Sequence, residues 1–392
     1  MQTLTVHNNR VGPIRGRHPW VFSGALVQVP EGLVSGDPVR LADEQGNFLA
    51  SGYFNSYSQI AVRLWSWQED EAVDGEFFAR RIRAALGLRE RSVAGPNTTA
   101  YRLVHAENDG LPGLIVDRYD QYLVVQCHTP GIARWKDEIV AALVASIKPV
   151  GIYERSDVRE RGGEKTVETA AVLYGEVPDK IHILENGYTF IVDVKGGQKT
   201  GFFLDQRDKR QALVKYCPGK KVLNCFSYTG GFSVYALAAG AAQVTSVDAS
   251  IPALDLAEQN VQVNHLDGSK TEFIAADVKE YLAGQARGAW DVIILDPPAF
   301  IKDRRKLKEG LQGYRKINEL ALRILSQNGI LVTASCSVHV SLIDFRFMLC
   351  EAAARAGRTV QILETYTHGA DHPQLVAFTE GEYLKCLIVR TR

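Results

Sequence analysis

The 392-residue sequence lacks several features that would restrict its class at once. Its six cysteines include no CxxC pair, which argues against a zinc site, and we expect no metal. No run approaches the roughly 20 apolar residues that a membrane helix needs. The start of the chain also lacks the apolar segment of a secretory signal. We therefore expect a cytoplasmic protein with reduced thiols and no membrane association.

An excess of charge of one sign is also missing. The chain has 45 basic and 45 acidic residues, so its formal net charge is zero. A nucleic-acid partner would therefore have to be held by local basic patches rather than by a positive field of the whole molecule. The length predicts two or three domains, and the 46% of hydrophobic residues are enough to bury a core in each.

Three regions can be distinguished along the chain. Residues 1–73 contain short strands separated by turn signals, which predict a small closed β-barrel. Residues 74–184 mix helical patterns with strands, as in an α+β domain. Residues 185–392 alternate strands and helices, which predicts an α/β domain with a mostly parallel sheet covered on both faces. The expected strands of the first and last regions are 21–29, 38–42, 48–53, 60–65, 221–224, 243–248, 271–275, 292–296, 330–335 and 383–389.

Glycines and carboxylates follow three successive strands of the last region. Gly230 and Gly231 come after the first strand, at a helix start whose free N–H groups can bind a carboxylate. Asp248 ends the second strand, where it can accept both ribose hydroxyls of a nucleoside, and Asp277-Val278 follows the third, near an adenine edge. Each alone could equally be a turn residue, but together they predict a nucleoside site. The loop is not GxGxxG, which argues against a nicotinamide-dependent dehydrogenase.

At this point the sequence resembles the class I methyltransferases, and more narrowly the PUA-domain 23S ribosomal RNA cytosine-C5 methyltransferases. The resemblance covers nearly the whole chain. It implies a Rossmann-like domain with a mostly parallel seven-stranded sheet and an N-terminal PUA-like barrel. It also implies S-adenosylmethionine as methyl donor and 23S ribosomal RNA as substrate. A homodimer is possible, but the sequence does not determine the oligomeric state. The motifs that carry it are QKTGFFLDQR from residue 198, NCFSYTGGFS from 224, SVDAS from 246, LDPPAF from 295 and SCS from 335.

The resemblance also implies which residues border the donor. The residues expected to contact S-adenosylmethionine are Lys199, Thr200, Phe203, Asp205, Gln206, Phe226, Ser227, Tyr228, Gly230, Asp248, Ala249, Asp277, Val278, Asp296 and Pro297. Two positions depart from related patterns. Better-known RNA cytosine-C5 enzymes have a second cysteine where this chain has Pro298, so the base that removes the C5 proton is unassigned. The narrower family often has a lysine where this chain has Ala299.

Asp296 and Cys336, at the ends of the fourth and fifth strands, are the expected catalytic residues. Asp-Pro-Pro also occurs in enzymes that methylate exocyclic amines, so this motif alone allows either N- or C-methylation. A thiolate suits addition to C6 of cytosine, because it is strongly nucleophilic and can leave again. Cys336 therefore favours C5 methylation through a covalent adduct. The alternatives are an RNA guanine or adenine N-methyltransferase without covalent catalysis, and a non-catalytic RNA-binding factor.

Two basic stretches are the expected RNA contacts. Arg15 and Arg17 lie beside His18 and Trp20, and arginine with an aromatic ring is typical of surfaces that hold phosphates and stack bases. The second stretch follows the fourth strand, next to the expected base pocket. Its residues predicted to bind RNA are Lys302, Arg304, Arg305 and Lys306.

Overall fold

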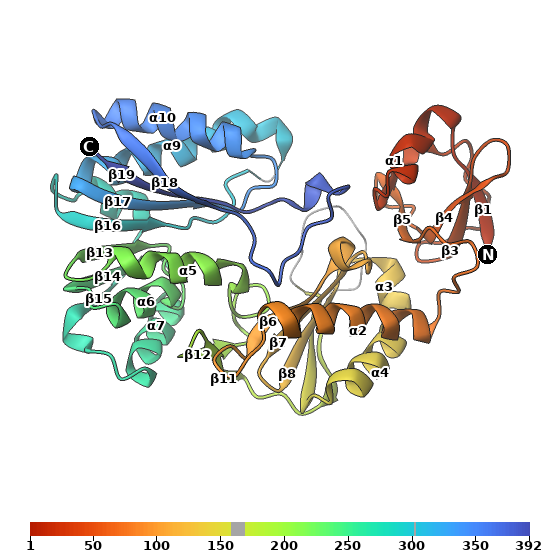
Figure 1. The fold of residues 1–392 in the computed structure, drawn as a ribbon, viewed down its shortest axis with the longest axis horizontal. Helices are drawn as coiled ribbons and strands as arrows, with labels where there is room; N and C mark the ends of the chain where they lie inside the picture. The colour runs from red at the N-terminus through yellow and green to blue at the C-terminus, as the bar shows by residue number, and fades with distance from the viewer. Residues whose placement is uncertain (158–168, 302) are drawn as a thin grey trace. The chain divides into compact units, whose positions relative to one another are not determined.

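The computed structural model describes residues 1–157, 169–301 and 303–392, and its chain divides into two compact units (Figure 1). The first unit comprises Met1–Ile183, Val192–Leu204 and Ala370–Gly381. The second comprises Leu184–Ile191, Asp205–Gly369 and Glu382–Arg392. The domain boundaries predicted near residues 74 and 185 stay a prediction.

The N-terminal part of the first unit is the expected small barrel. Its five-stranded sheet runs in the order β1 (Gln2–Thr5), β3 (Pro38–Ala42), β4 (Phe48–Phe54), β5 (Ile60–Ser66) and β2 (Trp20–Phe22). Backbone hydrogen bonds of 2.9 Å from Val27 N to Thr5 O and from His7 N to Ala25 O join the end of β1 to the segment after β2, and so close the sheet.

The strand predicted for residues 21–29 is wrong beyond Phe22. Ser23–Ala25 form a 3₁₀ turn instead, and the chain then runs without a regular strand. The alternation of residue types resembled a strand there, but Val27 and Val29 are exposed and bury no apolar face. The short helix α1 (Val11–Arg15) packs its two apolar residues, Val11 and Ile14, into the barrel core.

A second five-stranded sheet completes most of the first unit. Its order is β10 (Ala170–Gly175), β9 (Gly151–Arg155), β8 (Tyr122–Cys127), β7 (Leu114–Tyr119) and β6 (Ala100–His105). Three helices accompany it: α2 (Gly75–Ser92), α3 (Pro130–Arg134) and α4 (Lys136–Ile147). The helix α2 begins where the carboxylate of Asp74 accepts a hydrogen bond from Phe77 N, and it buries its apolar face in the core below.

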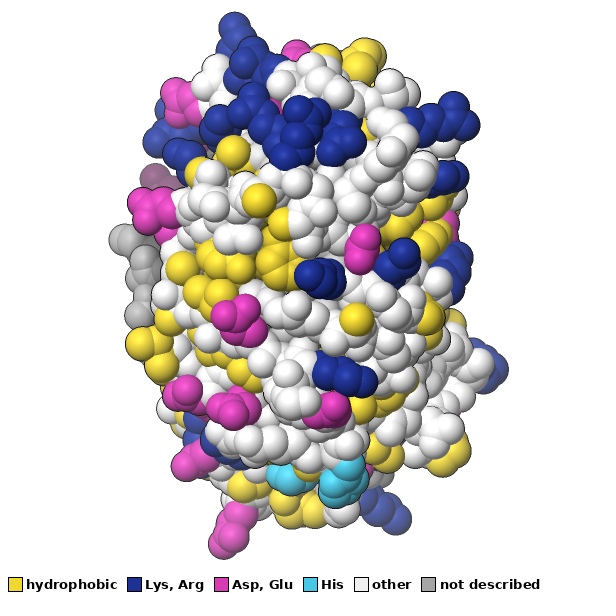
Figure 2. Space-filling view, turned by 90° about the vertical axis from the view of Figure 1, so that its left-hand side faces the viewer, with side chains coloured by type: hydrophobic (Ala, Val, Ile, Leu, Met, Phe, Trp, Pro, Cys, Tyr) yellow, Lys and Arg dark blue, Asp and Glu magenta, His cyan; other side chains and the backbone are white. Residues whose placement is uncertain are grey.

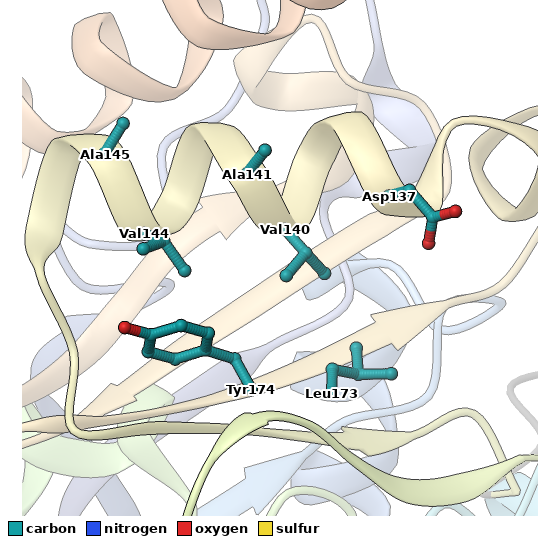
Figure 3. Close-up of a pocket in the computed structure, with 7 residues that line it drawn as sticks. All are labelled: Asp137, Val140, Ala141, Val144, Ala145, Leu173 and Tyr174. Carbon is teal, nitrogen blue, oxygen red and sulfur yellow. The ribbon is translucent and has the colours of Figure 1, made fainter.

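A hollow of about 430 Å³ lies between α4 and β10 (Figure 3). Among the described residues that line it, Asp137 is the only charged one, and it lies at one end. Aliphatic side chains of α4, together with Leu173 and Tyr174, form the rest of its wall. The described lining therefore offers no set of groups for acid–base or nucleophilic chemistry.

The second unit contains the predicted seven-stranded, mostly parallel sheet, which is thereby confirmed. Its strand order is β15 (Thr271–Ala275), β14 (Gln243–Asp248), β13 (Lys221–Cys225), β16 (Trp290–Leu295), β17 (Leu325–Ser335), β19 (Lys385–Thr391) and β18 (Val360–Tyr366). The first five strands pair in parallel, whereas β19 is antiparallel to both of its neighbours. β11 (Lys180–Glu185) and β12 (Tyr188–Asp193) form a separate two-stranded sheet, whose residues are divided between the two units.

Helices cover both faces of this sheet. α9 (Leu307–Ile324) and α10 (Leu342–Ala356) lie over one face, and α6 (Gly231–Ala238) and α7 (Ile251–Val263) over the other (Figure 1). α5 (Arg207–Leu213) and α8 (Val278–Ala283) complete the helical set of this unit. The central strands are apolar on both sides because both sides are buried, and Val292, Ile293, Ile294 and Leu295 are each at most 1% exposed.

Candidate active site

The candidate site is built at the carboxyl ends of the parallel strands. The chain proceeds from β13 through β14 to β15 on one side, and then returns to the other side for β16 and β17. The reversal lies between β13 and β16, which is where doubly wound sheets bind their ligands. Asp248 is the last residue of β14, and Asp296 and Cys336 directly follow β16 and β17 at this edge.

The loop after β13 has a backbone shaped for close approach. Phe226, Tyr228 and Gly230 have φ values of 57°, 46° and 75°, all in the left-handed region. A Cβ on Gly230 would lie 2.8 Å from the Cβ of Ala257, so only glycine fits there. The helix α6 begins directly afterwards with no side-chain cap, which leaves its first N–H groups for a ligand.

Asp248 is held rigidly beside this loop. Its Oδ2 accepts a 2.9 Å hydrogen bond from Tyr228 N, and its Oδ1 accepts one of 2.9 Å from Ser250 N. Each carboxylate oxygen retains a further lone pair that can accept a ribose hydroxyl. The side chain is half-buried and the next residue, Ala249, is exposed, so this strand end faces open space.

Asp277, which is predicted to lie near the adenine, has a structural function in the fold. Its carboxylate caps α8 by accepting a 3.0 Å hydrogen bond from Glu280 N. The residue is exposed, so its second oxygen stays accessible. Val278 is only 3% exposed and packs in the core, so its backbone, not its side chain, is the part that can meet a ligand.

The acidic residue after β16 is positioned by residues close in space and distant in sequence. Gln206 Nε2 donates a 2.9 Å hydrogen bond to Asp296 Oδ1. The adjacent Asp205 accepts a 2.7 Å hydrogen bond at its Oδ2 from Tyr383 OH. The buried Lys209 lies near both carboxylates, and burial is the main cause of the lowering of its pKa. This network fixes the direction in which the Asp296 carboxylate points.

Cys336 differs from the other cysteines at this edge of the sheet. Its side chain is half-buried, and its Sγ lies 4.0 Å from the carbonyl oxygen of Pro297 in the Asp-Pro-Pro motif. Cys225, at the end of β13, is completely buried, and this burial raises the pKa of its thiol. The thiol of Cys336 therefore adjoins Pro297, the residue directly after Asp296, whereas the rival thiol lies in the core.

Three residues predicted to contact the donor belong to the first unit. The ammonium of Lys199 lies 5.4 Å from the ring centre of Phe203. The hydroxyl of Thr200 is buried, donates a 2.7 Å hydrogen bond to Asp117 Oδ2, and lies 2.9 Å from Tyr119 OH. Thr200 thus already has structural partners in this unit. A contact of these three residues with the donor stays a prediction.

The predicted RNA-binding arginines of the barrel have neighbours that the local sequence does not reveal. Arg15 lies 3.4 Å from Asp43, and Arg17 stacks on the ring of Trp67 at 5.4 Å. A hollow of about 480 Å³ lies close by, and its lining includes Arg10, His18, Trp20 and Phe22. Aromatic rings beside a guanidinium can stack an unpaired base.

The second basic stretch is exposed in the second unit. Arg304, Arg305 and Lys306 form a short 3₁₀ turn with open side chains, and Arg305 is paired with Asp303 at 2.5 Å. Lys302 lies outside the described residues. Figure 2 shows Lys and Arg side chains gathered at the top of the drawn face, the side on which α9 and α10 lie. Basic and acidic residues are equal in number over the whole chain, but they are unevenly distributed over this face.

The residues around the β13 loop fit the methyl donor. Within the described residues, the hydroxyl of Ser227 is buried without a hydrogen-bond partner, as expected of a group that serves a ligand. Gly230, Asp248 and the open start of α6 would hold the amino-acid and ribose parts. When bound, S-adenosylmethionine supplies an electrophilic methyl group.

The structure as described contains no group of three or more His, Cys, Asp or Glu side chains suited to a metal ion. Nor does any described helix combine the length and apolar character that a membrane span requires.

Comparison with known proteins agrees with this geometry. A family model described as S-adenosylmethionine-dependent methyltransferase matches residues 162–390, and one described as a PUA-like domain matches residues 4–67. Proteins named ribosomal RNA large subunit methyltransferase I are 44% identical in Aeromonas hydrophila subsp. hydrophila, over 96% of both chains, and 43% identical in Tolumonas auensis, over 99% of both. A methyltransferase structure solved in complex with SAH is 26% identical, with a TM-score of 0.86 over all of both chains. The chain therefore belongs to this family of S-adenosylmethionine-dependent methyltransferases that carry a PUA-like domain at the N-terminus.

Proposed function

We propose that this enzyme transfers a methyl group from S-adenosylmethionine to C5 of a cytosine in 23S ribosomal RNA, through an adduct between Cys336 and C6. The observation that carries the proposal is the half-buried thiol 4.0 Å from the Pro297 carbonyl oxygen, beside Asp296. Ribosomal RNA is supported by the relatives named ribosomal RNA large subunit methyltransferase I.

In this reaction the chain's own residues first bind and orient the base. Asp296 accepts or shares hydrogen bonds at the N3 and amino edge of the cytosine, with its carboxylate held by Gln206. The Cys336 thiolate then forms a bond to C6, and C5 becomes nucleophilic and takes the methyl group. A base removes the C5 proton, the double bond between C5 and C6 forms again, and the bond to sulfur breaks. The target base must leave its stack, which costs least in single-stranded RNA.

RNA is proposed to be held by the two basic stretches. Arg304, Arg305 and Lys306 supply positive charge on the chain segment that follows the Asp-Pro-Pro motif. Lys302 belongs to the same proposal on sequence grounds alone. Arg15 and Arg17 lie in the barrel, which supplies the aromatic part of the lining of the nearby hollow, and such a lining suits an unpaired base.

The test replaces the proposed nucleophile. Cys336→Ala should lower methyl transfer by at least about 10³-fold, because removal of a covalent nucleophile abolishes the main route. The matched control is Cys350→Ala, since Cys350 is an exposed cysteine of the same unit that the mechanism does not use. The modified nucleoside should be 5-methylcytidine by mass spectrometry. An active Cys336→Ala enzyme that forms an N-methylated guanine or adenine would overturn the proposal in favour of N-methylation.

A further inference from the structure

A buried lysine precedes the apolar run of β19, next to the proposed nucleophile. Lys385 begins β19, pairs with Ser335 of β17, and is only 1% exposed. The next four residues of the strand, Cys386 to Val389, are apolar and at most 1% exposed. A lysine is rarely buried so completely unless its charge has a specific use, because removal of an ammonium group from water is costly.

The ammonium group of Lys385 is tethered beside Cys336. Its Nζ donates a 2.8 Å hydrogen bond to the carbonyl oxygen of Ser337, the residue directly after the cysteine. The same serine is fixed from the other side by Tyr314, whose hydroxyl lies 2.9 Å from Ser337 Oγ. The turn that carries Cys336 is thus held between α9 and β19.

The charge of Lys385 has no carboxylate as a direct partner. Across the three described ranges of the chain, no Asp or Glu lies within 4.0 Å of its Nζ. Burial lowers the pKa of Lys385 to about 8, while negative charge at Glu382, Cys336 and Asp344 acts in the opposite direction. Among these groups, Cys336 is the one whose charge belongs to the proposed reaction. Tyr314, packed against the same turn, has its own pKa raised by burial and stays neutral.

We propose that Lys385 is a positioning residue whose ammonium group stabilises the thiolate form of Cys336 and thereby prepares it for attack on the cytosine. This inference rests on the proposed function for the identity of the attacked base. The thiolate and the ammonium together contain the same protons as the neutral thiol of Cys336 and the neutral amine of Lys385. Going from the neutral to the ionised pair breaks one S–H bond and forms one N–H bond, with no other reactant. When the thiolate leaves C6 at the end of the cycle, it returns to the same ammonium neighbour.

The proposal is tested by the pH profile of Cys336 alkylation in the full chain without RNA. A Cys350→Ser background removes the exposed cysteine, and the other four cysteines are buried. The rate of reaction with iodoacetamide is read from the mass of the peptide that contains residue 336. A nearby opposite charge shifts a pKa by about 1–3 units. The midpoint should therefore lie below about 8.5, the ordinary value of a free cysteine.

Two variants distinguish the charge of Lys385 from its hydrogen bond. Lys385→Met removes both, whereas Lys385→Gln removes the charge but can still donate to the Ser337 carbonyl. Both should raise the alkylation midpoint by at least about one pH unit, which lowers the rate at pH 7 about tenfold. A shift in the methionine variant alone would mean that the tether matters and the charge does not, and would overturn the proposal. An ordinary midpoint in the parent chain would also overturn it without any variant.

The outcomes separate this inference from the proposed function. The alkylation profile needs no RNA, and S-adenosylmethionine binding by calorimetry checks that each variant is folded. An active Cys336→Ala enzyme would defeat the covalent mechanism whatever the profile. An unshifted profile beside an inactive Cys336→Ala enzyme would defeat only the assignment of Lys385.

Discussion

The two halves of the seven-stranded sheet position their functional groups in different ways. At the ends of β13 to β15, Asp248 and Asp277 are fixed by backbone N–H groups within about twenty residues of themselves. At the ends of β16 and β17, the neighbours that position Asp296 and adjoin Cys336 come from distant parts of the chain, namely Gln206 and Lys385. The donor half is therefore encoded locally, whereas the acceptor half depends on the assembled fold.

The largest effect is expected in the acceptor half. Asp296→Asn keeps the shape of the side chain but removes its negative charge, and loss of one preorganised electrostatic group costs about 10²–10³-fold in rate. Turnover should fall by this factor, while the Kd for S-adenosylmethionine rises less than tenfold. Turnover assays and calorimetry check the two quantities. A variant that turns over normally would break the distinction between the halves.

A change in the donor half should weaken the binding of S-adenosylmethionine more than it lowers turnover. Asp248→Ala removes the carboxylate proposed to bind the ribose hydroxyls and releases Tyr228 N. Hydrogen bonds to a charged group contribute about 1.5–3 kcal/mol, so the Kd for S-adenosylmethionine should rise about 10–100-fold. Calorimetric titration measures this. Turnover at saturating donor should stay within an order of magnitude, and a collapse of turnover there would contradict the separation.

The donor loop also allows a stability test with an internal control. Gly230→Ala places a Cβ at a residue with a φ of 75° and only 2.8 Å from the Cβ of Ala257. It should therefore lower the free energy of unfolding of the second unit by about 1–3 kcal/mol. Gly240→Ala has a similar φ of 85° but no atom within 4 Å of the new Cβ, so it should cost less. Thermal unfolding of both variants compares the two costs. Equal losses would mean that backbone strain alone, without the close approach, accounts for the glycine.

The smallest expected effects concern RNA contacts outside the reacting centre. Arg304 forms no ion pair with any residue that the structure describes, whereas the adjacent Arg305 is already paired with Asp303 at 2.5 Å. Each phosphate contact contributes about −0.7 to the slope of log affinity against log salt on single strands. Arg304→Ala should reduce the slope by about this amount. Arg305→Ala should reduce the slope by less, and filter binding at several salt concentrations measures both slopes. A larger reduction for Arg305→Ala than for Arg304→Ala would contradict this prediction.

The strand ends of the second unit could be predicted because alternation of apolar runs with turn residues is a local signal. Asp248 and Asp296 follow such runs, and the parallel topology brings those ends to one edge. The strand proposed for residues 21–29 failed because a local pattern does not reveal whether its apolar residues find a core. The parallel pairing of β1 with β3 was likewise missed, because the partners are more than thirty residues apart.

The neighbours of the proposed nucleophile could not be predicted from local patterns. The closeness of Cys336 to Pro297 and of Lys385 to Ser337 depends on side-chain directions on neighbouring strands. One signal was nevertheless present in the sequence. Lys385 interrupts the apolar run from Leu384 to Val389, and a charge inside a strand that must be buried is a reason to look for a partner.

The most direct test of the account traps the proposed adduct. Ribosomal RNA containing 5-fluorocytosine is incubated with enzyme and S-adenosylmethionine; fluorine at C5 cannot leave as a proton, so the bond between sulfur and C6 should persist. The account predicts an RNA–protein complex stable to denaturation, with the nucleotide attached to Cys336 by mass spectrometry and absent in Cys336→Ala. Methyl transfer to unmodified RNA in the same preparation, without any trapped complex, would contradict the covalent mechanism.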